Sequence, residues 1–500
     1  MQRLAVSLSA LALIVVMVVN VALFAQNIQL RGQVAAQPQP GQADLNPTQA
    51  AQIADLQRQL DRSEQDRVKA TRDAAALRGQ IGPLQQSARE SDALKGQVQS
   101  LQQENQRLRG EVGNLQTMNT IGGQVVPLRG LAPLAQVPRT FMNHEQLRAY
   151  FTAELAQQWP PEAEQRDRAV LRALDMDPGA ADMRGAQIDS MVKSVLGFYD
   201  HATKQLVVVT DRAQMGVRDR VTYAHEFTHS LQDQHYDLAK LFARVEGNAD
   251  AQMALKGLVE GDATLTMAIY ARAHFSAADI ASYQLEQFQS LDLSGLWLGG
   301  GPLVESAAAF PYREGASFVA TLYQLGGWKA VEQAFARPPR STEQVLHPER
   351  YLAGEPPVDV RLPALRLAGW RVLAEDTLGE LYLRIYLEHQ IAPDQAAAAC
   401  LGWGGDRYQV LSDDQGRLAL ALWTAWDDQA AAGRFFDAAS SYVAAGTSSL
   451  ALIAADQNQL RWQLEGRQFY LSRAGDRVLL LHAPDGPTLD ALIGQLKAFG

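Results

Sequence analysis

The chain has 500 residues, of which 47% are hydrophobic, and its 45 basic and 55 acidic side chains give a formal charge of −10. This length exceeds one ordinary hydrophobic core, so we expect two or three domains plus non-globular segments. The acidic balance and the lack of a basic block argue against a nucleic-acid partner. The single cysteine, Cys400, excludes an intramolecular disulfide and cysteine-ligated zinc, and its apolar surroundings predict a small core residue.

The amino terminus predicts a membrane anchor. From Leu4 to Ala25 the chain is almost wholly apolar and uncharged, which is long enough to span a bilayer as a helix. A cleaved signal peptide is the alternative, but its apolar region is usually shorter, at about 7–15 residues. We therefore predict an uncleaved transmembrane signal-anchor over residues 1–26. Arg3 before it favours a cytoplasmic amino terminus, with the bulk of the chain outside the cell membrane.

A coiled coil is predicted over residues 51–118, after a linker rich in Gln, Pro and Ala over residues 27–50. Gly82-Pro83 is expected to break or kink its helix. A lone Asn at an a position with Leu at d positions specifies a parallel dimer. We therefore predict a parallel homodimer, and the alternative is a solvated or partly disordered stalk. The heptad residues are Val98, Asn105 and Val112 at a, and Leu94, Leu101, Leu108 and Leu115 at d.

A second linker is predicted over residues 119–140, because this stretch holds Gly122-Gly123 and several prolines. The globular part is expected to begin near Phe141. The pattern then predicts helices from His144 to Trp159 and from about Ala163 to Asp175, and two strands at 195–199 and 206–209 around a turn.

Five residues, His225-Glu226-Phe227-Thr228-His229, carry the clearest chemical signal. The preceding stretch from Arg218 lacks Gly and Pro and has helical spacing, which predicts a helix. Residues four apart share a helix face, so both imidazoles can hold one Zn²⁺ at roughly 2.0–2.1 Å. The adjacent carboxylate can take a proton from a zinc-bound water. This is the H-E-x-x-H pattern of zinc peptidases; the alternative is a pair of hydrogen-bonded core histidines.

A catalytic zinc needs a third protein ligand, and Glu260 is favoured. It falls in a second helical stretch, from about Asn248 to Ala273, that can pack against the first helix. Its neighbours are largely apolar, and the small residues Gly261 and Ala263 permit a close approach of the helices.

Two rival ligands stay open. Glu246 is a second carboxylate downstream of the motif. His235 has the spacing of the third histidine in metzincins, but Gln232 stands where that class uses Gly to turn the chain back to the metal. Four other histidines are expected to be incidental: His201, His274, His389 and His482.

Past Leu362 the pattern changes to short strands alternating with helices. Trp403-Gly404-Gly405-Asp406 is expected to form a tight turn into a strand. The expected strands lie at 407–411, 418–423, 460–464, 468–472 and 478–482, with helices at 429–444 and from Thr488.

The motif region resembles a group of bacterial gluzincin-type zinc metallopeptidases. The resemblance is carried by His225 to Gln234 (HEFTHSLQDQ) and by Val259-Glu260-Gly261-Asp262-Ala263. Further similar pieces are Gly197-Phe198-Tyr199-Asp200, Ser341 to Pro348 and Gly402 to Asp406. It covers the chain from about Phe141 onward, but not the anchor or the coiled coil. It implies zinc peptidase chemistry without a particular substrate, supports Glu260 over His235, and implies an edge strand along the substrate cleft.

We therefore predict an α+β protein behind a transmembrane helix and a coiled coil. A mainly helical, zincin-like metallopeptidase domain with a short β-hairpin is expected over residues 141–360. An α+β carboxyl-terminal domain is expected over residues 361–500.

The ligand set predicts a mechanism. Zn²⁺ on His225, His229 and Glu260 lowers the pKa of a bound water to about 7, and Glu226 acts as general base. Asp262 could orient a ligand histidine or act at the helix terminus. A further donor should stabilise the oxyanion, and the candidates in order are Tyr312, His347 and Tyr351.

The predicted function is a membrane-anchored zinc metallopeptidase that cleaves a peptide or protein substrate outside the cytoplasm. The alternative is a non-catalytic coiled-coil envelope or scaffold protein with a structural or vestigial metal site. A third hypothesis is a peptidase fold that cleaves no peptide bond, or only its own chain. The complete H-E-x-x-H favours the first, since a decayed enzyme commonly loses its base.

Overall fold

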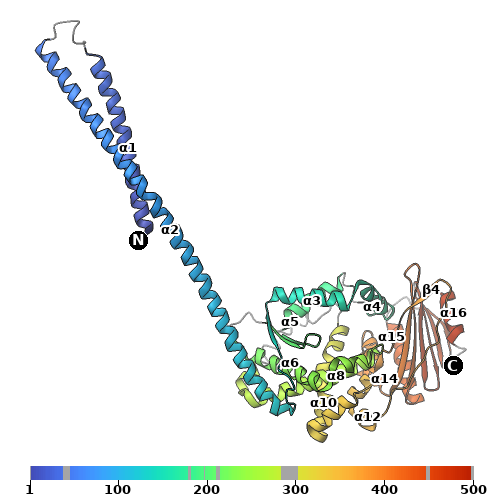
Figure 1. The fold of residues 1–500 in the computed structure, drawn as a ribbon. Coiled ribbons are helices and arrows are strands. Elements are labelled where there is room, and N and C mark those ends of the chain that lie inside the picture. The colour runs from blue at the N-terminus through green and yellow to red at the C-terminus, as the bar shows by residue number, and fades with distance from the viewer. Residues whose placement is uncertain are drawn as a thin grey trace. The chain divides into compact units, whose positions relative to one another are not determined.

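The computed structural model is a mixed α+β protein (Figure 1). It describes residues 2–37, 46–177, 179, 182–195, 197–209, 214–282, 302–445, 451–464 and 466–496, with only the backbone described at 2–14 and 302–305. The chain divides into two compact units, Met1–Arg109 and Gly110–Gly500. One helix, α2 (Pro47–Arg129), contributes residues to both units.

The first unit pairs α1 (Gln2–Ala35) with the amino-terminal part of α2. The Thr71 hydroxyl donates to Oδ1 of Asn20 at 3.2 Å, and Arg31 forms an ion pair with Glu64. From Val15 to Ala35, α1 is long and apolar enough to cross a membrane, although a signal sequence has the same properties. The predicted 27–50 linker is wrong where these helices continue, and residues 38–45 lie outside the described residues.

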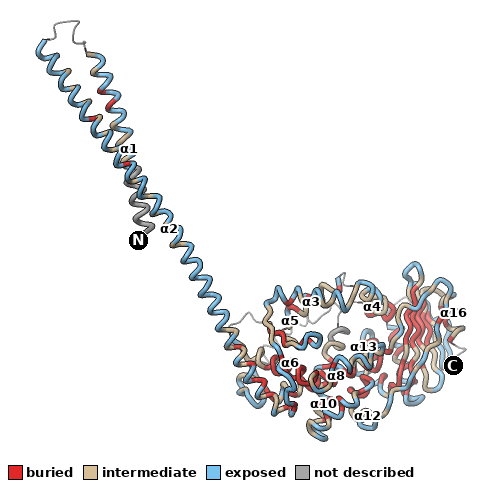
Figure 2. The backbone as a smooth tube through the Cα atoms, viewed as in Figure 1, coloured by how far each residue is buried: buried red, intermediate tan, exposed pale blue. Residues whose placement is uncertain are grey.

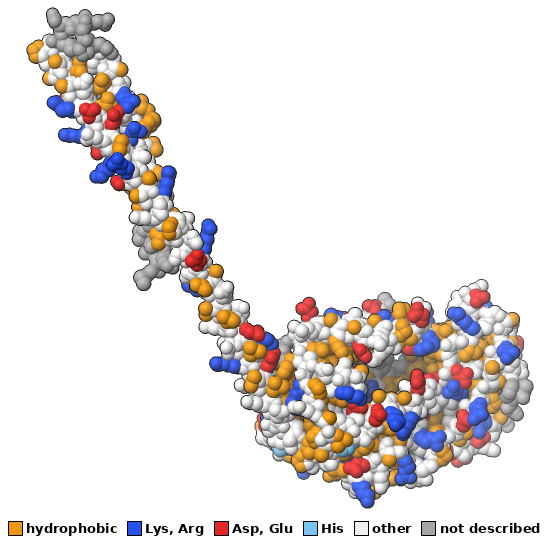
Figure 3. Space-filling view, viewed as in Figure 1, with side chains coloured by type: hydrophobic (Ala, Val, Ile, Leu, Met, Phe, Trp, Pro, Cys, Tyr) orange, Lys and Arg blue, Asp and Glu red, His pale blue; other side chains and the backbone are white. Residues whose placement is uncertain are grey.

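Helix α2 runs without a break through Gly82-Pro83, so the predicted break is wrong. Proline removes only one backbone donor from the helix. Because α2 is 83 residues long, the hydrogen bonds on both sides of Pro83 hold the helix together. Most of the predicted heptad residues are exposed, with Leu94, Leu101 and Leu108 at 60%, 68% and 47%, but Leu115 packs against the core that contains Phe227. Figure 3 shows hydrophobic side chains spaced along this helix. The parallel dimer therefore stays a prediction.

The predicted 119–140 linker is also wrong in its first half, because α2 continues to Arg129. Met118, Ile121 and Val125 have no exposed surface and pack in a core with Phe227. Gly122 faces the same ring, where an added Cβ would lie 3.1 Å from Cζ of Phe227. The glycine thus serves close packing of two helices, where composition had indicated a flexible loop.

A small sheet precedes the motif helix. Its strand order is β1 (Arg139–Met142), β3 (Gln205–Val209) and β2 (Gly197–Asp200), with β1 parallel and β2 antiparallel to β3. The predicted hairpin is confirmed, whereas β1, with four residues, was not predicted. Helix α3 (His144–Gln158) packs on β1 and on α5 (Met183–Ser194), whereas α4 (Pro161–Ala173) packs on strands of the carboxyl-terminal sheet described below.

The helical layer that follows has α6 (Val217–Tyr236), α7 (Leu238–Ala243), α8 (Ala249–His274), α10 (Pro302–Ala336), α11 (Thr342–Leu346) and α12 (Pro348–Ala353). Non-helical backbone at Gly326 and Gly327 divides α10. Helices α8 and α10 approach so closely that a Cβ on Gly261 would lie 2.2 Å from the carbonyl oxygen of Gly315. The small residue beside Glu260 therefore serves the contact with α10.

The carboxyl-terminal part is a seven-stranded antiparallel sheet in the order β4-β5-β6-β10-β9-β8-β7. The strands are β4 (Trp370–Asp376), β5 (Trp403–Asp413), β6 (Leu418–Trp426), β7 (Ala451–Ala455), β8 (Gln459–Leu464), β9 (Arg467–Ala474) and β10 (Arg477–Ala483). The helices are α13 (Gly379–Glu388), α14 (Pro393–Cys400), α15 (Gln429–Ala445) and α16 (Gly486–Leu496). The predicted strands and helices of this part are confirmed; β4, β7, α13 and α14 were not predicted.

The main core runs from the helical layer into the sheet (Figure 2). Leu258 of α8 and Phe310 of α10 belong to the same buried cluster as Phe435 and Leu480 of the sheet region. A predicted division at residue 360 therefore does not separate two cores. Helix α16 packs on β9 and β10 in a second buried cluster. Cys400 is fully buried, which confirms the core prediction.

The predicted turn at Trp403 to Asp406 is wrong, because these residues begin β5. The glycines there admit a neighbouring segment: the Val358 amide donates to the Gly404 carbonyl at 2.7 Å. A Cβ on Gly405 would lie 2.3 Å from the Val358 carbonyl oxygen. Close backbone contact therefore explains Gly405.

Candidate metal centre

Helix α6 presents both histidines of the motif on one buried face. Val221, Ala224 and Leu231 lock this helix into the core with at most 1% of their surface exposed. His225 and His229, four residues apart, are 8% and 6% exposed. The ring nitrogens Nε2 of the two histidines lie 3.0 Å apart. The predicted helix is confirmed, and it brings the two imidazoles together.

Helix α8 packs against α6 and supplies the carboxylate of Glu260. Its Oε2 lies 3.1 Å from Nε2 of His225 and 3.3 Å from Nε2 of His229. Among the described residues, these three form the only group of three or more metal-ligating side chains that converges in this way. The predicted second helix is confirmed, and Asn248 caps it. Gly261, which was predicted to let this helix approach the first one, instead faces Gly315 of α10.

The spacing of the three ligand atoms fits one tetrahedral cation. Zinc bonded to nitrogen and oxygen at about 2.0–2.1 Å places its ligand atoms about 3.3 Å apart. The observed separations of 3.0, 3.1 and 3.3 Å form a nearly equilateral triangle of that size. Three protein ligands leave the fourth tetrahedral position open, as in catalytic zinc sites.

The electrostatics of the three groups favour a bound positive charge. Burial would raise the pKa of Glu260, but the neighbouring His229 and His225 hold it well below its usual value. Burial would lower the pKa of His229, but Glu260 raises it to about 9. A buried carboxylate that holds a proton on its neighbour provides the same attraction to a metal ion.

Glu226 lies beside this cluster and is anchored by the small sheet. The backbone amide of Tyr199, on the outer strand β2, donates to Oε2 of Glu226 at 2.9 Å. Burial raises the pKa of Glu226, and the charges of His225 and His229 oppose that change. A carboxylate with a raised pKa is suited to accept and return a proton.

The outer nitrogen of His229 is held by a residue that the sequence interpretation had set aside. Nδ1 of His229 lies 2.8 Å from Oε1 of Gln232. The Gln232 amide nitrogen donates to Oδ2 of Asp262 at 2.8 Å and to the Val259 carbonyl at 2.9 Å. Asp262 therefore acts on the ligand histidine through Gln232 and not directly. The sequence signal for this role of Gln232 was its position three residues after His229, on the same face of the helix.

The three predicted oxyanion donors lie in different places. Tyr312 is at the cluster, with its ring centroid 6.1 Å from that of His225. Loss of solvent and the charges of Glu260 and Glu226 raise the pKa of its phenol. His347 contacts Glu380 at 3.0 Å, and the Tyr351 hydroxyl donates to the Arg337 carbonyl at 2.9 Å. Only Tyr312 therefore has contacts that reach the predicted site residues.

The rival ligands point elsewhere, and one further histidine lies near the cluster. His235 contacts the Ala132 carbonyl at 2.7 Å, and Glu246 is exposed in the segment before α8. His201 was expected to be incidental, but its ring lies 6.5 Å from the ring of His229. Burial and the charge of His229 lower the His201 pKa.

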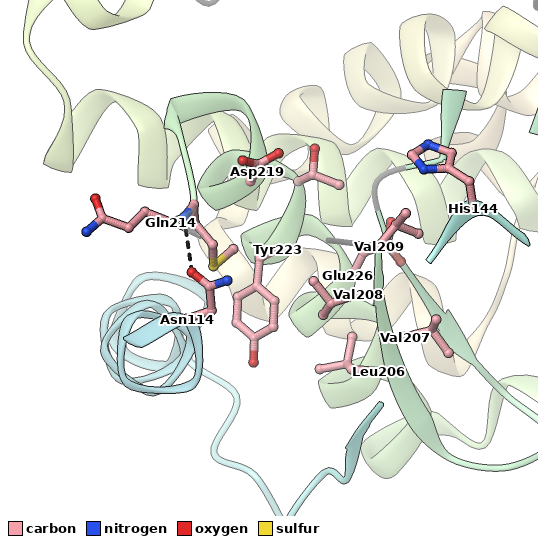
Figure 4. Close-up of a pocket in the computed structure, with 13 residues that line it drawn as sticks. Asn114, His144, Leu206, Val207, Val208, Val209, Gln214, Asp219, Tyr223 and Glu226 are labelled. Carbon is pink, nitrogen blue, oxygen red and sulfur yellow. Dashed lines mark hydrogen bonds between the residues drawn. The ribbon is translucent and has the colours of Figure 1, made fainter. Parts of the chain in front are cut away.

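A cavity of ≈ 240 Å³ adjoins Glu226 between α6 and β3 (Figure 4). Val207, Val208 and Val209 line one wall, and Tyr223 of α6 lines another. The far end is closed by Asn114 of α2, whose Oδ1 accepts from the Met215 amide at 3.1 Å. The cavity is thus mainly apolar and has the candidate base in its lining.

The comparisons with known proteins bear on the carboxyl-terminal sheet alone. The model of a domain of unknown function, DUF8575, matches residues 367–493. That match runs from just before β4 into α16 and does not include the metal cluster. Neither the curated proteins nor the solved structures give a match to this chain.

Proposed function

We propose that this protein is a zinc-dependent metallopeptidase of the gluzincin type. The observation that carries the proposal is the triangle of ligand atoms from His225, His229 and Glu260, with Glu226 at its side. Two histidines and a glutamate from two packed helices are the donor set of a catalytic zinc with one open position.

Each residue of the site has a definite task in this proposal. Zinc bound by the three ligands supplies a Lewis acid and an acidified water. Glu226, fixed by the Tyr199 amide, takes a proton and later returns it to the leaving amine. Tyr312 donates a hydrogen bond to the oxyanion from its position beside His225.

The substrate class follows from the surroundings of Glu226. The outer strand β2 presents its Tyr199 amide toward the base, so an extended peptide can lie along the same edge. The cavity of ≈ 240 Å³ beside Glu226, lined by valines of β3, accepts an apolar side chain. We therefore propose a peptide or protein substrate with an apolar residue next to the cleaved bond.

The proposed location is a membrane, with the catalytic unit outside the cytoplasm. It is supported by α1, which combines sufficient length with an exposed apolar surface. Val18, Val21 and Phe24 are 63%, 69% and 55% exposed, which is costly in water and favourable in lipid. We expect the full chain to sediment with membranes and to stay bound to them after a carbonate wash. A fully soluble product that starts after residue 26 would support a cleaved signal sequence.

The test of the activity is a paired assay of wild type and Glu226→Gln on a peptide library. Glutamine keeps the size of the side chain but cannot take the proton, so zinc should stay bound while hydrolysis falls about 10²–10⁴-fold. Glu246→Gln, at an exposed position, is the matched control and should keep full activity. Equal behaviour of wild type and Glu226→Gln would favour the non-catalytic scaffold instead.

A further inference from the structure

A line of buried polar contacts runs from the end of α2 to the ligand histidine. Nε of Arg129 donates to Oδ1 of Asp262 at 2.7 Å. The Gln232 amide nitrogen donates to Oδ2 of the same carboxylate at 2.8 Å, and the Gln232 oxygen lies 2.8 Å from Nδ1 of His229. Arg129, Asp262 and Gln232 have no exposed surface. Helices α2, α6 and α8 thus meet in one chain of contacts.

The contacts fix the orientation of the Gln232 amide. Its nitrogen faces two acceptors, the Asp262 carboxylate and the Val259 carbonyl, so the amide oxygen must face His229. In the neutral ring, an acceptor at Nδ1 places the proton on that nitrogen, and the lone pair is then on Nε2. Nε2 is the atom that points to His225 and Glu260. The line of contacts therefore selects the form of His229 that can bind a metal.

Arg129 holds the outer end of this line. The planar guanidinium donates to one oxygen of Asp262, so the other oxygen is directed at Gln232. The same guanidinium lies 4.4 Å from the ring centroid of Trp328, whose indole nitrogen donates to the Leu128 carbonyl at 2.6 Å. Arg129 is therefore held on both sides, and the direction of the Asp262 carboxylate is determined by it.

We propose that Arg129, the last residue of α2, is a positioning residue for the metal centre. It acts through Asp262 and Gln232 to hold His229 in the Nδ1-protonated form with Nε2 free for zinc. This inference rests on the proposed metal site and deepens it. It assigns a role in metal binding to the end of α2, which the composition of residues 119–140 had indicated to be a linker.

The test replaces the ion pair without leaving a buried charge. The double variant Arg129→Met/Asp262→Leu is expected to fold, because well-packed apolar residues often replace a buried ion pair at little cost. Zinc affinity, measured on the full chain by competition with a chelator, should fall about 10–100-fold, the range for loss of an outer partner of a ligand histidine. The absorption spectrum of the cobalt-substituted protein should change with it.

The matched control removes another arginine pair of the same unit. Nη2 of Arg184 lies 3.1 Å from Oε2 of Glu164, well away in sequence from the metal residues. Arg184→Met/Glu164→Leu should leave zinc affinity and the cobalt spectrum unchanged. If the first double variant does not fold, Gln232→Met cuts the same line of contacts with one substitution and should give the same 10–100-fold loss.

The outcomes separate this inference from the proposed function. Wild-type zinc affinity in a folded Arg129→Met/Asp262→Leu or Gln232→Met protein would overturn the role of Arg129. A wild-type chain that binds no zinc, or binds it equally well after His225→Ala, would overturn the metal centre itself.

Discussion

Arg129 and Asp262 form an ion pair in which Nε and Oδ1 lie 2.7 Å apart and neither side chain has any exposed surface. Burial opposes the charge of Arg129, but the attraction of Asp262 more than offsets it, so the pKa of Arg129 is raised. A buried pair of this kind is held in one geometry by its surroundings. The end of α2 is therefore part of the folded core that surrounds the proposed metal centre.

Tyr312→Phe is expected to lower kcat about 10²–10³-fold, because it removes one donor to the oxyanion. Zinc content and KM should change little, since Tyr312 is not a ligand. Tyr351→Phe is the matched control, because its hydroxyl donates to the Arg337 carbonyl. Steady-state kinetics on a peptide substrate measure both. Equal loss in the two variants would point to a structural effect and remove Tyr312 from the mechanism.

Gly261→Ala is expected to destabilise the protein by about 1–3 kcal/mol, because an added methyl overpacks the contact of α8 with α10. The new Cβ would lie 2.2 Å from the Gly315 carbonyl oxygen, which is backbone and cannot rotate away. Gly123→Ala, with nothing within 4 Å of its Cβ position in α2, should be neutral or stabilising by up to about 1 kcal/mol. Thermal unfolding of zinc-saturated protein compares the two, and similar values would show that the helix contact is looser than described.

The buried carboxyl of Asp250 is expected to make the free energy of unfolding fall as the pH rises. Burial raises the pKa of this carboxyl from its usual value of 3.8 to about 8. Between these two values the folded state keeps a proton that the unfolded chain has lost, so stability falls with rising pH and levels off above about 8. The amide in the Asp250→Asn variant does not titrate, so this contribution to the pH dependence is absent. The melting temperature of the variant minus that of wild type should therefore increase as the pH rises over the same range. A difference that does not vary with pH would show that Asp250 is ionised in the folded protein.

The elements closest to the chemistry could be predicted because their signals are local. The spacing of His225 and His229, and the apolar stripe of Val221, Ala224 and Leu231, determine a helix and its buried face from adjacent residues alone. Glu260 could be favoured for a related reason, since its helix is periodic and its neighbours are small or apolar.

The remaining parts of the site depend on contacts that no local pattern encodes. Arg129 and Asp262 are 133 residues apart, and Gln232 links Asp262 to His229 only after the helices have packed. Gly122 indicated a loop by composition. In the fold it lies within α2, where the lack of a side chain lets the ring of Phe227 pack against the helix. His201 lacked a sequence partner because its neighbour, His229, lies on another element.

The exposed heptad of α2 predicts self-association. Lysines introduced by Leu101→Lys and Leu108→Lys would face each other across a parallel seam, so the molar mass from light scattering should drop from that of a dimer to that of a monomer. Gln103→Lys with Gln106→Lys adds the same charge outside the a and d positions and should leave the dimer intact. A wild-type monomer at all concentrations would contradict the predicted coiled-coil dimer.

The most direct measurement of the central claim is the zinc content of the purified full chain by elemental analysis, made in parallel on wild type, Glu226→Gln and Glu260→Ala. We expect one zinc ion per chain in wild type and in Glu226→Gln, because both keep the three ligands. Glu260→Ala should lose the metal, because the two histidines alone leave the site without its only carboxylate ligand. A wild-type protein without zinc, or a Glu260→Ala protein that retains a full complement, would contradict the account.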